Sequence, residues 1–299
     1  MRRRDLFKVA AAIPGVAAAA RIDVSSIKTR AAKKVEIVYK SPHPGPNGLQ
    51  TTKEGLWILD HGAEGWVSLV NPSDGKVIRE FMVAGLDAPS GITVDPDNNI
   101  WINSSHNCMT ITCSSQDGKV TAKRWTHGAQ RPLRMKGDPP SARTPLEPAY
   151  PRPQTAAAPA GGQGRGGRRA PAPYGQLPSD ATTGVTGMDG AQGMEFRDGF
   201  LYYASLPARV VYVVDPKTWE VQTTWAVAGN RAHGVGWDGD TLWVADTNWR
   251  AFFRHDMKSG QIVEKIQLTE KDPLIHGVTI RDGYMWYTDD VGYICNFKL

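Results

Sequence analysis

The sequence has only three cysteines among its 299 residues, and no long run of apolar residues. Three cysteines cannot form the dense disulfide scaffold of a small secreted protein. The apolar stretch at residues 9–19 is too short to cross a bilayer as a helix. With 40% apolar and 22% charged residues, the chain has the composition of a globular protein, not of a disordered or membrane-spanning one.

Excess positive charge is also missing from the part of the chain expected to fold, although the net charge is +5. Residues 1–34 carry +7 and residues 130–180 carry +5, which leaves −7 on the rest. An acidic folded body argues against a nucleic-acid-binding face, which needs clustered Lys and Arg. We therefore expect a small-molecule ligand as the partner, and a monomer.

The N-terminus carries the segment Arg3-Arg4-Asp5-Leu6-Phe7-Lys8, which resembles the twin-arginine export motif of bacteria. The apolar stretch and four consecutive alanines follow it. We therefore predict a signal peptide over residues 1–20 and a linker over residues 21–34. The resemblance implies a periplasmic or secreted protein that keeps no membrane segment after cleavage.

A repeat organises the rest of the chain. Five times, a glycine before an apolar residue is followed nine or ten residues later by an aromatic residue in a short apolar run. Successive glycines are 43, 102, 41 and 43 residues apart, close to the period of a propeller blade except for one long gap. The five starts are Asn47-Gly48, Ser90-Gly91, Gln192-Gly193, His233-Gly234 and His276-Gly277.

Each repeat predicts four short antiparallel strands, and the whole predicts an all-β propeller of five blades over residues 35–299. The last repeat ends before its fourth strand, so we expect residues 35–39 to complete that blade and close the ring. Residues 126–190 fill the long gap and hold 11 of the 21 prolines, which predicts an irregular insertion without strands or helices. A sixth blade within this insertion is the alternative.

In a propeller, the residue before each repeat glycine and the residue that ends the second strand are expected at one mouth of the central channel. His233 and His276 are therefore candidate catalytic bases. The candidate ligands of a divalent metal (Mg, Ca or Zn) are Asp289, Asp246, Asp60 and His61. The candidate substrate-binding residues are Asn47, Gln192, Ser205, His106 and Trp249. A turn-capping role for the aspartates is the alternative, as is a purely structural role for the histidines.

The repeat unit resembles those of virginiamycin B lyase and of NHL-type propellers, over residues 47–125 and 190–299. This resemblance implies that His276 acts as a base and that Asp289 belongs to a magnesium site. Gln192-Gly193-Met194-Glu195-Phe196 also resembles a repeat start in the five-bladed bacterial glutaminyl cyclotransferases. The function expected is that of a lyase or hydrolase acting on a small polar or cyclic substrate. A non-enzymatic propeller that binds a ligand or protein is the alternative.

Overall fold

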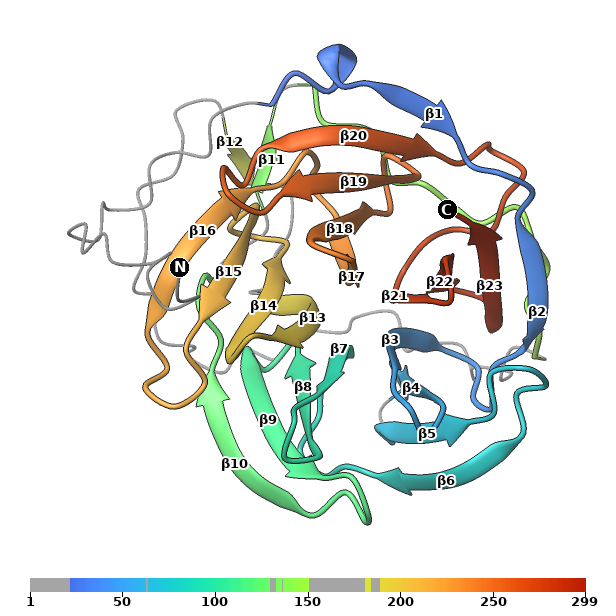
Figure 1. Ribbon diagram of the computed structural model, residues 1–299, viewed down its shortest axis with the longest axis vertical. Coiled ribbons are helices and arrows are strands. Elements are labelled where there is room, and N and C mark those ends of the chain that lie inside the picture. The colour runs from blue at the N-terminus through green and yellow to red at the C-terminus, as the bar shows by residue number, and fades with distance from the viewer. Residues whose placement is uncertain (1–21, 63, 130–132, 136, 151–180, 184–188) are drawn as a thin grey trace, which may run out of the picture.

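Five small antiparallel sheets surround a central axis and form a ring of blades (Figure 1). The computed structural model describes residues 22–62, 64–129, 133–135, 137–150, 181–183 and 189–299. The expected signal peptide lies outside these residues. The fold is the predicted all-β propeller with five blades, and the described part of the insertion contains no sixth blade.

The first three blades each contain four strands that run from the axis to the rim in chain order, as the repeat predicts. Blade 1 consists of β3 (Pro46–Thr51), β4 (Leu56–Asp60), β5 (Trp66–Val70) and β6 (Val77–Met82). Blade 2 consists of β7 (Pro89–Val94), β8 (Asn99–Ser104), β9 (Met109–Ser114) and β10 (Val120–Trp125). Blade 3 consists of β13 (Ala191–Arg197), β14 (Phe200–Ser205), β15 (Val210–Val214) and β16 (Val221–Ala226).

Blade 5 confirms the predicted closure of the ring. Its three C-terminal strands are completed by an N-terminal strand, which pairs antiparallel with the last strand of the chain from Glu36–Asn296 to Lys40–Tyr293. This pairing removes two open sheet edges. Blade 5 consists of β21 (Val278–Arg281), β22 (Tyr284–Thr288), β23 (Tyr293–Lys298) and β2 (Glu36–Lys40).

Blade 4 contains a strand that the repeat does not predict. Its four repeat strands are β17 (Ala232–Asp238), β18 (Thr241–Asp246), β19 (Ala251–Asp256) and β20 (Ile262–Gln267). A fifth strand, β1 (Thr29–Ala31), pairs parallel with β20 at the rim, after the short 3-10 helix η2 (Val24–Ser26). The expected linker therefore belongs to the ring in its described part.

The insertion departs from the prediction that it contains no strands. β11 (Leu133–Met135) and β12 (Ala181–Thr183) form an antiparallel pair of their own. Residues 137–150, which follow β11, cross one end of the ring: the Ala142 N–H donates to Asn248 Oδ1 at 3.1 Å and the Ala149 N–H to the Val291 carbonyl at 2.7 Å. In Figure 1 this light green segment passes behind β20 and reaches the side of β2.

The five repeat glycines explain how tightly the inner strands approach one another. A Cβ atom added to Gly193 would lie 2.2 Å from the His233 carbonyl oxygen, and one added to Gly277 would lie 2.4 Å from that of Asn47. No other residue fits such contacts. The glycines thus let neighbouring inner strands approach each other closely around the axis.

The far end of the channel holds a buried polar layer three residues after the mouth positions. Thr93 Oγ1 donates to Gln50 Oε1 at 2.8 Å, and the Phe196 N–H donates to Thr93 Oγ1 at 3.0 Å. The Gln50 side chain also donates to Glu195, which joins blade 1 to blade 3 across the axis. Burial raises the pKa of Glu195 to about 8, so its carboxyl group is mainly protonated at neutral pH.

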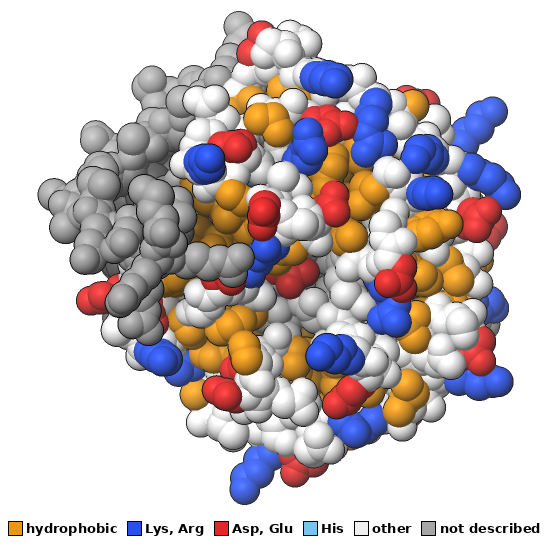
Figure 2. All heavy atoms as spheres, viewed as in Figure 1, with side chains coloured by type: hydrophobic (Ala, Val, Ile, Leu, Met, Phe, Trp, Pro, Cys, Tyr) orange, Lys and Arg blue, Asp and Glu red, His pale blue; other side chains and the backbone are white. Residues whose placement is uncertain are grey.

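The blades pack against one another through apolar clusters, which use the aromatic residues of the repeat. Trp57, Trp243 and Tyr287 are almost completely buried between blades. All three cysteines are buried, and none of them forms a disulfide with another described residue. On the face shown in Figure 2, basic and acidic side chains are interspersed, without a continuous patch of one sign. Within the described residues, no helix is long and apolar enough to cross a membrane.

Candidate functional site

A cavity of about 360 Å³ lies at the end of the ring where the repeats begin. All five residues that precede the repeat glycines line it: Asn47, Ser90, Gln192, His233 and His276. In blades 1 to 4 the strand pairing shifts register at this residue. A shift of this kind bends the strand and redirects a side chain, so the same local irregularity turns each of these residues toward the axis.

The residues that end the second strands do not line the cavity. Asp60 accepts hydrogen bonds from the N–H groups of Gly45 and Gly62, each at 2.7 Å. Asp246 accepts from the N–H groups of Arg231 and Trp249, at 2.8 and 3.0 Å. Both carboxylates therefore hold the loops around the mouth, which is the turn-capping alternative of the sequence analysis.

Two more of the positions predicted for the mouth, Asp289 just after β22 and Ser205 at the end of β14, also point away from the cavity. Asp289 Oδ1 accepts from the N–H groups of Val291, Gly292 and Tyr293, at 2.8 to 3.0 Å. Asp289 Oδ2 is buried without a partner among the described residues, and burial raises the pKa of this carboxyl to about 6. Ser205 Oγ lies 3.5 Å from the Gly128 carbonyl, away from the cavity.

The cavity instead uses the residue that follows each second strand. His61, Ser105, Leu206 and Asp290 line it, and their positions are one residue beyond the predicted ones. In blade 4 the equivalent residue, Thr247, holds a cavity histidine. The signal was present in the sequence, since these residues occupy one fixed place in every repeat, but strand alternation alone does not show which way a turn residue points.

Histidine 276 is held in one tautomer by Asn47. His276 Nδ1 lies 3.0 Å from Asn47 Oδ1, which can only accept, so Nδ1 carries the hydrogen. The Asn47 amide nitrogen lies 3.3 Å from the Pro89 carbonyl and 3.2 Å from Ser90 Oγ, which supports this orientation of the amide. His276 Nε2 therefore carries the lone pair, and it is buried without a partner among the described residues.

Histidine 233 is held in the same tautomer by Thr247. The Thr247 hydroxyl donates to the Ile275 carbonyl at 2.7 Å, so it accepts from His233 Nδ1 at 2.9 Å. His233 Nε2 makes no hydrogen bond to a described residue, and it is not fully buried. This nitrogen is therefore the lone pair that a ligand in the cavity can reach.

The two imidazoles are neighbours, with ring centroids 4.5 Å apart in an edge-to-face arrangement. Burial lowers the pKa of both histidines well below the usual value. For His233 the neighbouring His276 adds to this effect, and the charge of Arg231 lowers both pKa values further. The pair is therefore neutral near pH 7.

Several charged groups that the sequence analysis missed surround this pair. Arg231, Asp189 and Asp290 line the cavity with it. Burial lowers the pKa of Arg231 and raises the pKa values of both carboxyls. Two residues named from the sequence also lie here: His61 and His106, whose ring centroids are 6.4 Å apart. Burial is the main cause that lowers the pKa of His61.

The aspartates expected to bind a metal direct most of their carboxylate oxygens at the backbone. Asp60 and Asp246 direct their oxygens at backbone N–H groups, as does Oδ1 of Asp289. In the part of the chain that the structure describes, no group of three or more His, Cys, Asp or Glu side chains is arranged to hold a metal ion. These carboxylate oxygens are thus engaged by the backbone, and a bound divalent metal stays a prediction.

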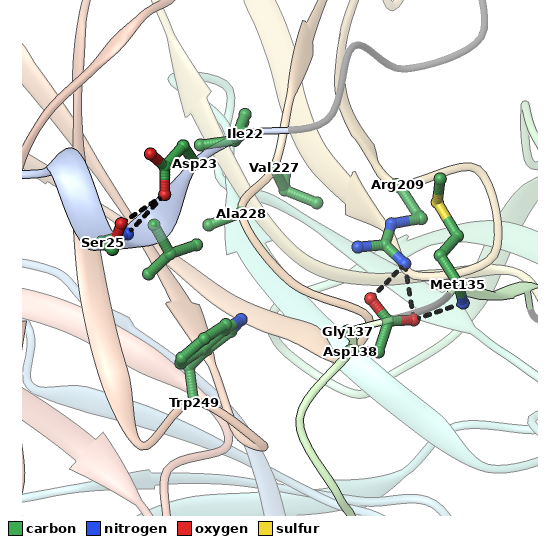
Figure 3. Close-up of a pocket in the computed structure, with 11 residues that line it drawn as sticks. Ile22, Asp23, Ser25, Met135, Gly137, Asp138, Arg209, Val227, Ala228 and Trp249 are labelled. Atoms are coloured by element: carbon green, nitrogen blue, oxygen red, sulfur yellow. Dashed lines mark hydrogen bonds and ion pairs between the residues drawn. The ribbon is translucent and has the colours of Figure 1, made fainter.

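A second cavity, of about 440 Å³, lies between the N-terminal segment, the insertion and blades 3 and 4 (Figure 3). Trp249 lines this cavity and not the mouth where we expected it. Among the described residues, Arg209 has the only guanidinium in the lining, and it is paired with both oxygens of Asp138 at 2.8 Å. Since no described histidine lines this cavity, the first cavity is the better candidate for chemistry.

Comparison with known proteins supports the fold. No protein-family model and no curated protein matches the sequence. The glutaminyl cyclase of Myxococcus xanthus matches 91% of this chain and 97% of its own, with a TM-score of 0.53 and 9% identity. Virginiamycin B lyase from Staphylococcus aureus matches 89% and 99%, with a TM-score of 0.46 and 17% identity. The similarity to the cyclase confirms the expected resemblance at the level of a β-propeller fold, and at 9% identity it carries no activity over to this chain.

Proposed function

We propose that this protein is an enzyme of the lyase or hydrolase type, in which His233 acts as a general base on a small polar or cyclic substrate. One observation carries the proposal: His233 Nε2 is a lone pair that faces the cavity, on an imidazole whose other nitrogen is held by Thr247. A merely structural histidine in a buried position normally has both nitrogens paired.

The proposed step begins with the neutral histidine. Nε2 takes a proton from the bound substrate, or from a water that attacks it, and the Nδ1–H group keeps its bond to Thr247. The positive charge then forms beside His276, whose own Nε2 has no donor. His276 lowers the pKa of His233 and so helps to keep the base unprotonated before the step, while Asn47 keeps the His276 ring in place.

The test is a substrate screen on small esters, lactones and cyclic amides with the wild type, His233→Ala and His276→Ala. His43→Gln is the matched control, because His43 stacks on Trp66 outside the cavity. We expect His233→Ala to lower kcat/KM by roughly 100-fold or more and the control to leave it unchanged. Full activity in His233→Ala would rule out the proposed base. Incorporation of solvent deuterium into carbon indicates a lyase, and incorporation of heavy oxygen from water indicates a hydrolase.

The pH profile provides an independent check. A base works when it is unprotonated, so a pKa below the usual value moves the acid limb of kcat/KM to lower pH. We expect activity at about pH 5.5 to remain close to that at pH 7. A decline centred near the ordinary histidine value of 6.5 would contradict the arrangement of the buried pair.

Export by the twin-arginine route belongs to the same proposal, and it rests on Arg3-Arg4 and the apolar stretch that follows. Replacing both arginines with lysine is expected to keep the protein in the cytoplasm when it is expressed in a bacterium that has this route. Unchanged recovery from the periplasm would contradict this part of the proposal.

A further inference from the structure

The cavity contains a cation that is bonded to no carboxylate of the described residues. Arg231 is partly buried in the lining, and its guanidinium donates no hydrogen bond to any residue that the structure describes. No described carboxylate oxygen lies within 4.0 Å of its nitrogens. Since burying an unpaired guanidinium is costly, such a group is expected to be compensated by a bound anion.

An unpaired carboxylate faces the same cavity. Asp290 is exposed at the edge of this cavity, in the connection between β22 and β23. Its neighbour Asp289 accepts three backbone hydrogen bonds, whereas the Asp290 side chain accepts none from another described residue. Arg231 and Asp290 influence each other electrostatically, but they are too far apart to form an ion pair.

The third charged group of the lining is already partnered. Asp189 Oδ1 accepts from the Gly190 N–H at 2.9 Å and lies 3.4 Å from the Gln192 amide nitrogen. Among the described residues, the charged groups left for a ligand are therefore one cation and one anion, which line the same cavity as the histidine pair. A simple anion would leave Asp290 unpaired, and a simple cation would leave Arg231 unpaired.

We propose that the cavity binds a small zwitterion, whose carboxylate contacts Arg231 and whose ammonium group contacts Asp290. The cavity is at the small end of the range for ligand sites, which suits a molecule of amino-acid size. This inference rests on the proposed function for its reaction, since it names the substrate class of that site, but the binding it describes does not require catalysis. The carbon next to the carboxylate would then lie where His233 Nε2 can reach its proton.

The test is calorimetric titration of the whole protein with glycine, β-alanine and γ-aminobutyrate, whose two charges are increasingly far apart. Acetate and methylammonium, each with one charge, are the reference ligands. We expect at least one of the three zwitterions to bind about tenfold or more tightly than either reference ligand. Arg231→Met and Asp290→Asn should each weaken that binding by about tenfold or more.

Asp282→Asn is the matched control, because Asp282 lies in the turn at the other end of the same blade and carries the same charge. It should leave the binding unchanged. Asp290 is exposed, so its variant tests the proposal even if Arg231→Met does not fold. Absence of binding by all three zwitterions, equal binding of acetate, or unchanged affinity in Asp290→Asn would overturn the inference. A His233→Ala variant that binds a zwitterion but has lost activity would support both proposals, whereas loss of activity without any zwitterion binding would leave only the proposed function standing.

Discussion

The buried carboxyl group of Glu195 is expected to make the free energy of unfolding depend on pH. Glu195 lies in the polar layer at the far end of the channel, where Gln50 and the N–H groups of Phe196 and Trp237 contact it. These hydrogen bonds favour the ionised form, but burial outweighs them and raises the pKa from 4.5 to about 8. The folded protein therefore holds a proton that the unfolded chain releases.

The stability of the protein depends on pH because the folded and unfolded states bind different numbers of protons. Between pH 4.5 and about 8, the folded state keeps the Glu195 proton and the unfolded state does not, so stability falls as the pH rises through this window. The free energy of unfolding falls by about 3 kcal/mol up to pH 7, and by roughly 5 kcal/mol in total once the pH is above 8. Glu195→Gln keeps the shape and a neutral head group, so it should remove this loss.

Urea unfolding of the wild type and of Glu195→Gln, from about pH 4.5 to pH 8.5, measures the difference directly. We expect the two proteins to be nearly equal at the acid end, and the variant to gain up to roughly 3 kcal/mol at pH 7. A difference that does not change with pH would refute the assignment of the proton to Glu195. A variant that is less stable at every pH would show that the carboxyl group is needed as a hydrogen-bond partner.

Two further predictions concern the ring and its loops. Gly193→Ala should destabilise the protein by roughly 3 kcal/mol or more, because the new Cβ atom would clash with the His233 carbonyl oxygen. Gly45→Ala is the control and should be tolerated, since the nearest atom to its new Cβ lies at 3.5 Å. Equal melting temperatures of the two variants would contradict the close approach of the inner strands. Asp289→Asn keeps the oxygen that accepts the backbone hydrogen bonds and removes the ionisable carboxyl group. Because the pKa of Asp289 is raised from 3.8 to about 6, ionisation of this group lowers the free energy of unfolding by about 3 kcal/mol at pH 7. The variant should therefore be at least as stable as the wild type in urea unfolding at pH 7. Asp289→Ala loses three backbone hydrogen bonds and should be less stable than Asp289→Asn at every pH, and the opposite order would contradict the capping role.

The sequence predicts the fold well because the propeller depends on features that recur at a fixed spacing. The glycines permit the close approach of the inner strands, and the aromatic residues fill the space between blades, so both leave a period of about forty residues. β1 was not predicted because three residues without apolar alternation carry no strand signal. The pairing of β11 with β12 was missed because it joins residues almost fifty positions apart within a proline-rich segment.

The candidate site was predicted in part. The five mouth residues are those that directly precede the repeat glycines, and the structure brings them to one cavity. The aspartates were misplaced because a carboxylate at the end of a strand can fold back on the next turn, and that choice depends on loop geometry which the sequence does not show. Arg231 precedes its repeat glycine by three residues and has no equivalent in the other blades, so no periodic signal marks it.

The chain meets its own beginning only through non-covalent contacts, since β2 pairs with β23 and the Lys33 ammonium donates to the Leu299 carbonyl at 2.8 Å. The two ends of the chain segment that forms the ring are thus neighbours in space. A rearranged gene that places residues 33–40 after residue 299 through a short linker would encode the same five blades, with the break in the chain between two blades rather than inside one. In the natural order, blade 5 can be completed only when the first and last parts of the chain have both been synthesised, so the ring as a whole closes last.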